Sequence, residues 1–450
     1  MISRLVDLHQ KRQGPQPIRR ALWSAMLGMG LDGYDLSIMA VALLSLTPSW
    51  GLSPWETGVV MAMPLLGSFF GALLGGAVID RWGRRRLLLP NVVLYALGAG
   101  LSAISPNLLV LSVARFIVGL GIGLDYPLVS TLVAEYRRTA DRGQGFVWIN
   151  LAWESGALLS SLVGWWFFDF GPDAWRWMLG SAVIPAVLLL QVRRKLPESP
   201  RWLARHARLE AADRALRLLR PEWQHSERMT ALGLYAGQCR HWSDLLRKQW
   251  HRRLFLGVLP WFFLDVVGLG VALYFPTVLR SEGLATTDAQ AAVINAIFIG
   301  LSMAGMALIL PRIDRVGRVR LQWMGFFAMA FGLITLSLAL LSHRSWAVFL
   351  GAGVYCLGIG MGPGVTVFAL AVELFPTDLR GSASGLAAAV ARIGALLSAV
   401  GFPLMETGVT IPGVLAILAV CAIAAAWVTW HYQLETKGLS LEYLETSTKP

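Results

Sequence analysis

Asp80-Arg81-Trp82-Gly83-Arg84 is repeated about 235 residues later as Asp314-Arg315-Val316-Gly317-Arg318. A second stretch, Gly156-Ala157-Leu158-Leu159-Ser160, recurs letter for letter at 394–398. Because the two repeats have nearly the same spacing, the second half of the chain is a duplicate of the first. The sequence therefore predicts two structurally equivalent halves.

Hydrophobic residues make up 56% of the 450 residues, and charged residues make up only 15%. Charge this sparse cannot cover the surface of a water-soluble globule, so the composition predicts a membrane protein. A helix needs roughly 20 residues to cross about 30 Å of hydrocarbon, and twelve apolar stretches meet this requirement, six in each half. In chain order they are Ala21–Leu46, Glu56–Ile79, Leu87–Ile104, Leu108–Ala134, Gln144–Phe168, Trp175–Val192, Leu254–Leu279, Asp288–Leu310, Leu321–Leu341, Trp346–Leu374, Ser382–Leu404 and Pro412–Tyr432.

We therefore expect an all-α membrane protein whose twelve transmembrane helices form two pseudo-symmetric six-helix bundles, residues 1–192 and 254–450. Pro363, inside a glycine cluster, predicts a bend in the tenth span. Residues 193–253 are polar, and the amphipathic spacing of Leu209–Leu219 predicts short cytoplasmic helices there. This segment is too short for a catalytic domain, and the sequence has no Gly-Lys-Ser or Gly-Lys-Thr loop. We predict neither an enzyme nor an ATP-driven pump.

The net charge of +12 is explained better by membrane topology than by a nucleic-acid partner. Arg115 and Arg392 lie within spans, and Arg176, Arg280 and Arg344 lie at one set of span ends. All other Lys and Arg lie on the opposite side, which the positive-inside rule identifies as the cytoplasm. We expect a multi-pass protein of the cell (inner) membrane with both termini in the cytoplasm.

Five stretches resemble signature motifs of the major facilitator superfamily and of its sugar-porter-like branch. They are Gly76–Arg85, Arg115–Gly123, Pro197–Leu203, Glu373–Gly381 and Glu435–Gly438. The resemblance covers nearly the whole chain. It implies the major facilitator fold, two halves that rock about a midplane site, and a monomer that needs no cofactor because a proton gradient is its energy source.

The resemblance also implies a cytoplasmic gate that joins the halves when the central chamber faces outward. Carboxylates and guanidiniums at helix ends would form charge-assisted pairs there. Repetition of the motifs in both halves favours a gate over solvated loops, whereas we interpret the runs 84–86 and 193–195 as topology-determining positive loops. The predicted gate residues are Asp80, Arg81, Gly83, Arg84, Glu135, Arg142, Glu198, Arg201, Asp314, Arg315, Gly317, Arg318, Glu373 and Arg380.

Ionisable residues inside the spans are functional candidates because each costs several kcal/mol to bury. Helical rise places Asp35 and Arg115 at similar depths, so we expect them to meet. The resembling proton symporters pair an Asp of the first span with an Arg of the fourth. The resemblance therefore implies that Asp35 and Arg115 couple transport to protons, with Asp32 as a second proton site. A static ion pair that only fixes helix packing is the alternative.

Glu154, Asp265 and Arg392 form a second group of charges near the midplane. The repeat superimposes Asp32 on Asp265 and Glu154 on Arg392, and such equivalent positions converge on a central cavity. We predict that Arg392 binds a substrate carboxylate and that Glu154 competes for Arg392 in the empty state. For Asp265, a place in the cavity and a pairing within its own half are equally supported.

The segment 32–35, Asp-Gly-Tyr-Asp, resembles the first-span signature of the aromatic acid:proton symporters. Trp153, Tyr274 and Phe298 are candidates to hold an apolar or aromatic substrate body, with core or lipid packing as the alternative for each. The seventh span contains neither Gln nor Asn, the residues that bind sugar hydroxyls in sugar porters. This absence weakens a hexose assignment.

We predict a proton-coupled symporter that imports a small organic anion, such as a monocarboxylate or aromatic acid. Because four acids outnumber two arginines among these six buried charges, a cationic or zwitterionic substrate is an alternative. A neutral sugar is a weaker alternative, and export instead of import stays open. A membrane ligand sensor that signals through residues 193–253 is the alternative outside transport.

Overall fold

The computed structural model describes residues 16–235, 241–281, 283–286, 288–406 and 409–446. Throughout these residues the regular structure is helical and no β-strand occurs. In the described part of the chain, eleven helices or helix pairs are long and apolar enough to cross a bilayer, and the remaining expected span, the eighth, contains the shorter apolar segment Val293–Ile309. The predicted all-α membrane fold is confirmed.

The N-terminal bundle contains six membrane-spanning segments, and the structure splits the last of them at Ala182. The segments are α2 (Gln16–Trp50), α3 (Pro54–Trp82), α4 (Arg85–Ala103), α5 (Leu108–Tyr136), α6 (Arg142–Phe167), and α7 (Ala174–Ser181) followed by α8 (Val183–Arg193).

The C-terminal bundle repeats this arrangement. Its segments are α12 (His251–Ser281), α13 (Asp288–Ile309), α15 (Arg318–Leu341), α16 (Ser345–Met361) followed by α17 (Pro363–Glu373), α18 (Arg380–Glu406) and α19 (Ile411–His431). The predicted bend at Pro363 is confirmed, because the helix is interrupted at Gly362. Proline lacks the N–H that a continuous helix would need at this point.

Short helices connect and extend the bundles. The linker forms α9 (Pro200–Arg205), α10 (Leu209–Leu219) and α11 (His225–Tyr235), which pack on one another through Trp202, Leu216 and Leu232. Helix α10 coincides with the predicted amphipathic stretch. The turn α14 (Ile313–Val316) precedes α15, and α20 (Leu441–Thr446) follows the last span.

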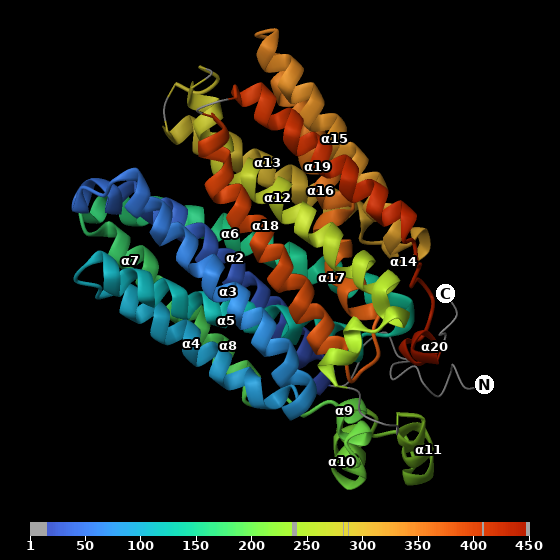
Figure 1. Cartoon of the computed structure of the whole chain (residues 1–450). Coiled ribbons are helices and arrows are strands. Elements are labelled where there is room, and N and C mark those ends of the chain that lie inside the picture. Colours follow the sequence, from blue (N-terminus) through green and yellow to red (C-terminus); the bar gives the residue numbers. More distant parts are fainter. Residues whose placement is uncertain (1–15, 236–240, 282, 287, 407–408, 447–450) are drawn as a thin grey trace.

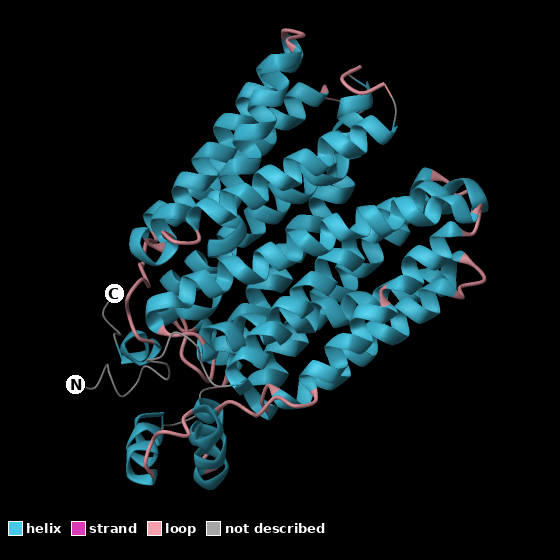
Figure 2. Ribbon diagram, turned by 180° about the vertical axis from the view of Figure 1, so that it is seen from behind, coloured by secondary structure: helices cyan, strands magenta, loops and turns pink. Residues whose placement is uncertain are grey.

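The two bundles meet at the end of the molecule near α9 and diverge toward the opposite end (Figures 1 and 2). We call these the linker end and the far end. The closest approach between the bundles joins α3 to α18. A Cβ added to Gly76 would lie 2.4 Å from the carbonyl oxygen of Gly381, and one added to Gly385 would lie 2.3 Å from that of Ala72. Only glycine permits this backbone contact between the halves.

The repeated Asp-Arg-x-Gly-Arg motif ends a helix in the same way in both halves. Gly83 and Gly317 have φ values of 92° and 108°, a region that favours glycine. A Cβ at either position would also lie 2.3 Å from a carboxylate oxygen, that of Glu198 or of Glu435 respectively. The glycine of the motif is therefore required by backbone conformation and by space.

Candidate functional site

Asp35 of α2 and Arg115 of α5 form a bidentate ion pair inside the N-terminal bundle. Arg115 Nη2 donates to Asp35 Oδ2 at 2.7 Å and Nη1 donates to Oδ1 at 3.2 Å. Both side chains are fully buried. The structure thus brings together the two residues that their depths in the sequence led us to pair, in the geometry of a strong charge-assisted contact.

Asp32 lies one turn before Asp35 and is also fully buried. Neither of its carboxylate oxygens has a hydrogen-bond partner among the described residues. The charges of Asp125, Arg193 and Arg392 act on it together with that of Asp35. Asp32 is therefore an unpaired carboxylate surrounded by other ionisable groups.

Arg392 of α18 pairs with Asp265 of α12, and not with Glu154 as expected. Arg392 Nη2 lies 2.8 Å from Asp265 Oδ2. Glu154 instead accepts a hydrogen bond of 3.2 Å from Ser302 of α13. The expectation was wrong because α12 packs directly against α18, whereas α6 faces α13 across the interface between the bundles.

An aromatic cluster adjoins the Arg392–Asp265 pair through Tyr126. The guanidinium carbon of Arg392 lies 5.0 Å from the ring centroid of Tyr126, within cation–π range. The Tyr126 ring is 5.9 Å from both Trp261 and Phe368, which are 4.4 Å from each other. Because Tyr126 belongs to the N-terminal bundle and the others to the C-terminal bundle, this aromatic cluster spans both halves.

The aromatic residues predicted from the sequence lie elsewhere. Phe298 packs against Phe275 at 5.1 Å and against Phe349 at 6.4 Å, so core packing explains it. Trp153 is partly buried against the main hydrophobic core. The side chain of Tyr274 lies outside the described residues. Hydrophobicity alone could not separate these rings from Tyr126, which faces Arg392, and the two rings that cluster with it.

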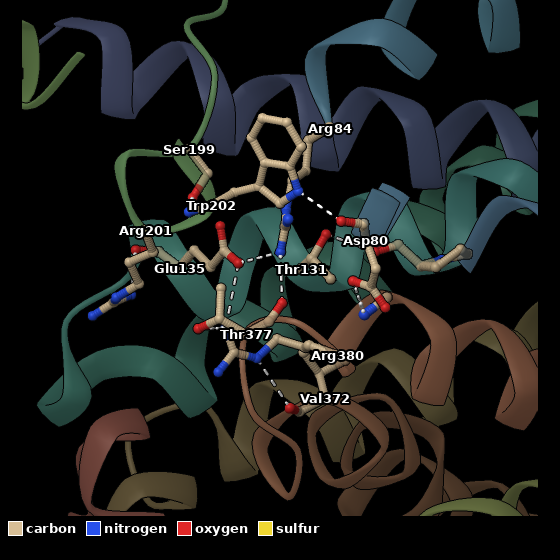
Figure 3. Close-up of polar contacts among 12 residues, drawn as sticks. Asp80, Arg84, Thr131, Glu135, Ser199, Arg201, Trp202, Val372, Thr377 and Arg380 are labelled. Atoms are coloured by element: carbon tan, nitrogen blue, oxygen red, sulfur yellow. Dashed lines mark hydrogen bonds and ion pairs between the residues drawn. The ribbon is translucent and has the colours of Figure 1, made fainter. Parts of the chain in front are cut away.

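A buried charge network joins the bundles at the linker end (Figure 3). Glu135 of α5 accepts hydrogen bonds from Arg84 at 2.5 Å and from Arg380 of the other half at 3.3 Å. Arg201 of the linker donates to the backbone oxygen of Glu135 at 3.1 Å, and Arg84 reaches the backbone oxygen of Thr377 at 3.4 Å. Glu135 thus joins the two bundles through its carboxylate and the linker through its backbone oxygen.

Glu373 is the counterpart of Glu135 in the second half. Arg142 of the first half donates to it at 2.6 Å, and Arg318 donates at 3.2 Å. Thr436 also donates to Glu373. The predicted pairing of repeated carboxylates and arginines across the halves therefore exists in the structure, in two pseudo-symmetric copies.

Two aspartates accept the N-terminal amides of helices in the opposite bundle. Asp80 accepts the N–H groups of Gly381 at 2.9 Å and Ser382 at 2.6 Å, at the start of α18. Asp314 accepts those of Gly143 at 2.9 Å and Gln144 at 3.2 Å, at the start of α6. A carboxylate at a helix N-terminus satisfies free amides and interacts favourably with the helix dipole.

One glutamate in each half accepts helix N-terminal amides of its own half. Glu198 accepts the N–H groups of Arg84 and Arg85 at 3.0 Å, and Glu435 accepts that of Arg318 at 2.9 Å. Burial raises the pKa of Glu198 above its ordinary value, while the neighbouring Arg84 and the backbone amides oppose this shift. Glu435 lies in the motif Glu435–Gly438 and is not among the gate residues predicted from the sequence.

The structure corrects three further expectations about the arginines. Arg84 and Arg193 are fully buried and paired, so neither is only a topology-determining charge, whereas Arg85, Arg86 and Arg194 are exposed. Arg81 and Arg315 were predicted in the gate, but both side chains lie on the exposed surface. Each follows its aspartate by one helical position, and the rotation of about 100° per residue turns it away from the interface.

Asp125 and Arg193 form the functional candidate that sequence analysis missed. Arg193 Nη2 lies 2.6 Å from Asp125 Oδ1, and both side chains are fully buried. The signal was present, because Asp125 is an ionisable residue inside the apolar span Leu108–Ala134. Tyr126, Trp261 and Ser302 were also missed by sequence analysis. Unlike a charged residue, a Tyr, Trp or Ser inside a membrane span does not by itself indicate a functional site.

Comparison with known proteins agrees with this architecture. The family model of the sugar (and other) transporters matches residues 21–447. The probable metabolite transport protein CsbC of Bacillus subtilis is 32% identical over 431 residues, which cover 94% of this chain and 93% of that protein. The D-xylose transporter of Levilactobacillus brevis is 27% identical over 94% of each chain.

Solved structures are similar over almost the full length. The proton:xylose symporter XylE of the major facilitator superfamily, bound to 6-bromo-6-deoxy-D-glucose, has a TM-score of 0.83 at 26% identity, with 95% of this chain and 98% of that chain covered. The inward open conformation of XylE from E. coli has a lower TM-score of 0.70 at 25% identity, with 95% and 99% covered. The lower value agrees with a linker end that is closed by ion pairs. The chain belongs to the sugar (and other) transporter family of the major facilitator superfamily and is a multi-pass membrane transporter, not an enzyme.

Proposed function

We propose that this protein is a proton-coupled symporter that imports a small organic anion with an aromatic or apolar body. The observation that carries the proposal is the position of Arg392, between the carboxylate of Asp265 and the ring of Tyr126. A guanidinium binds a carboxylate bidentately, and the adjoining rings offer an apolar surface to the rest of the substrate.

The charge balance of this pair supports coupling to protons. In the empty site Asp265 neutralises Arg392. A substrate carboxylate that binds Arg392 adds a negative charge in a buried, low-dielectric place, and such a charge is costly unless it is neutralised. Uptake of one proton by a neighbouring carboxyl group restores neutrality. Asp35 with Arg115 is the coupling pair in this proposal, and Asp32 assists as a second proton site.

Alternating access follows from the closed linker end. We assign this end to the cytoplasm, because the loops there carry most of the Lys and Arg. Opening toward the cytoplasm requires separation of Glu135 from Arg380 and of Glu373 from Arg142. Binding of substrate and proton must therefore stabilise the inward-open state by more than these contacts stabilise the closed one. The protein would act as a monomer in the cell inner membrane, without a cofactor.

A neutral sugar is the second candidate, because relatives of the chain are named as transporters of glucose and D-xylose. A pentose or hexose would use hydroxyl groups and not a carboxylate at the Arg392–Asp265 pair. Hydrogen-bonding sites of this kind discriminate strongly between substrates that differ in a polar group.

Uptake into proteoliposomes tests both candidates. The purified protein is reconstituted, an inward proton gradient is imposed, and uptake of labelled benzoate, a primary amine, D-xylose and D-glucose is measured in parallel. Gradient-dependent accumulation of benzoate, competed by other monocarboxylates, supports the proposal. Accumulation of a sugar or amine with no effect of monocarboxylates would reject the anion assignment, and equal flux without a gradient would reject proton coupling. Binding of a ligand without any flux would favour the sensor.

A further inference from the structure

One face of α2 carries a row of buried polar positions. Ser24, Asp32 and Asp35 follow one another at helical spacing, with Gly28 between Ser24 and Asp32, and all four residues are buried. With a rise of about 1.5 Å per residue, the row extends roughly 16 Å along the helix axis, from near the linker end to beyond the midplane. This face packs against α5 and α8 inside the N-terminal bundle, because Gly28 lies against Asp125 and Arg193 and Asp35 pairs with Arg115.

The part of the row near the linker end contacts a closed ring of polar side chains. Arg193 donates to Asp125 at 2.6 Å and to Asn91 Oδ1 at 2.8 Å, and its Nε donates to Ser24 Oγ at 3.4 Å. Asn91 in turn donates to Asp125 Oδ1 at 3.2 Å. The ring joins α2, α4, α5 and the last residue of α8, and the second oxygen of Asp125 stays without a hydrogen-bond partner among the described residues.

Gly28 leaves the space that this ring occupies. An ideal Cβ at Gly28 would lie 2.3 Å from Asp125 Oδ2 and 2.5 Å from Arg193 Nη2. The unpartnered oxygen of Asp125 therefore lies against the backbone of α2, one helical turn before Asp32. Gly28 itself places no side chain between this oxygen and the turn of α2 that carries Asp32.

Asp32 is the middle member of the row. It is fully buried, and both of its oxygens lack a partner among the described residues. The charged groups nearest in electrostatic effect belong to four helices: Asp125 of α5, Arg193 of α8, Asp35 of its own helix and Arg392 of α18. A buried carboxylate without a hydrogen bond is stable when a proton neutralises it, and it can then pass that proton to a neighbour.

We propose that this face of α2 is a proton path through the N-terminal bundle, in which Asp125 with Arg193 forms the station nearest the linker end. Asp35 with Arg115 is the outer station, and Asp32 lies between the two. The inference rests on the proton coupling of the proposed function, and it adds the route and the exit of the proton.

Each step moves one proton and no other atom. A protonated carboxyl group donates its O–H to the next carboxylate, directly or through one water molecule, and becomes a carboxylate itself. At the two ends of the path, Arg115 and Arg193 stabilise the carboxylate that remains after the proton has left. Arg193 is also the residue from which the linker begins, so a movement of the linker end changes the position of the guanidinium that contacts Asp125.

Proton movement and substrate exchange, measured separately, test the path. Wild type, Asp125→Asn and the double variant Asp125→Asn/Arg193→Gln are reconstituted with a pH-sensitive dye inside the vesicles, and labelled benzoate is the probe. Asp173→Asn is the matched control, because Asp173 forms an exposed Asp–Arg pair with Arg176 at the far end. We expect Asp125→Asn to keep benzoate exchange within about twofold and to lose about tenfold of the proton influx that accompanies benzoate.

The same number of protons per benzoate in Asp125→Asn and in wild type would overturn the inference. Asp125→Asn could also lose both benzoate exchange and proton influx. If the double variant does not restore them, the Asp125–Arg193 pair is purely structural and the inference is overturned. If wild type does not transport benzoate, the anion assignment fails and the path is tested without substrate. Infrared spectra then follow the carboxyl C=O band that Asp32→Asn removes. The pH at which this band titrates must differ by about half a unit or more between Asp125→Asn and Asp173→Asn, and equal values would reject the path.

Discussion

Asp80 accepts the backbone N–H of Gly381 at 2.9 Å, and this contact joins the end of α3 to the first turn of α18 in the other half of the molecule. Asp314 and Gly143 repeat the contact at the same distance. The closed linker end therefore depends on carboxylates placed at helix N-termini as well as on ion pairs between side chains. This relationship makes the gate sensitive to single charges that do not contact an arginine of the opposite half.

Asp80→Asn should open the linker end. A hydrogen bond to a charged group contributes about 1.5–3 kcal/mol, so the closed state should lose about tenfold or more of its population relative to the inward-open state. Spin labels at the exposed positions Arg86 and Arg320 report the distance between the halves. Glu56→Gln is the control, because Glu56 caps a helix N-terminus at the far end. An unchanged distance distribution in Asp80→Asn would contradict the role of this contact.

Gly385→Ala should prevent the closest approach of α3 and α18. The added Cβ would meet the backbone oxygen of Ala72 at 2.3 Å, and backbone cannot yield as a flexible side chain does. We expect a wider linker end by the same spin-label distance and at least about tenfold slower uptake. Gly58→Ala is a matched control in α3, because a Cβ there meets nothing within 4 Å. Equal transport by the two variants would show that the contact is not needed for closure.

Arg392→Lys should retain positive charge but lose the bidentate geometry and the contact with the ring of Tyr126. We expect anion uptake to fall about tenfold or more, and Arg392→Ala to abolish it. Because Arg392→Ala leaves Asp265 buried and unpaired, the double variant Arg392→Ala/Asp265→Asn separates lost folding from lost binding. Competition by monocarboxylates is the measurement. If monocarboxylates still inhibit uptake by Arg392→Ala as strongly as they inhibit uptake by wild type, the substrate carboxylate binds elsewhere.

Asp35→Asn should uncouple transport from protons while substrate exchange continues. The variant leaves Arg115 as an unpaired buried charge, which costs about 3–5 kcal/mol, so purified yield and thermal stability must be recorded. The double variant Asp35→Asn/Arg115→Gln removes both charges and should recover most of that stability. Accumulation of substrate against its gradient, driven by pH, is the measurement. Accumulation by Asp35→Asn equal to that of wild type would assign coupling to another carboxylate.

The membrane spans could be predicted from the sequence because hydropathy and helix length are local properties. The split of the tenth segment at Gly362–Pro363 and the amphipathic helix Leu209–Leu219 were also predictable, since each depends on neighbouring residues alone. The pair Asp35–Arg115 could also be predicted, because helical rise fixes the depth of a residue in the membrane and few charges share that depth.

Depth does not fix the direction in which a side chain points around its helix, and there the prediction was wrong. Glu154 and Asp265 were both candidates near Arg392, and only the packing of α12 against α18 selects Asp265. The burial of Arg193 also depends on a distant residue, Asp125, which no local pattern connects to it.

The sequence by itself determined the duplicated, twelve-span membrane architecture and the residue types that close the linker end, because both follow from local hydropathy and from motifs repeated in each half. Only the tertiary structure decided which buried charges are partners and that the buried carboxylate of Asp32 has no hydrogen-bond partner among the described residues. Those partnerships depend on helix rotation and on contacts between segments far apart in the chain, where a turn of one helix by a single residue replaces one neighbour by another.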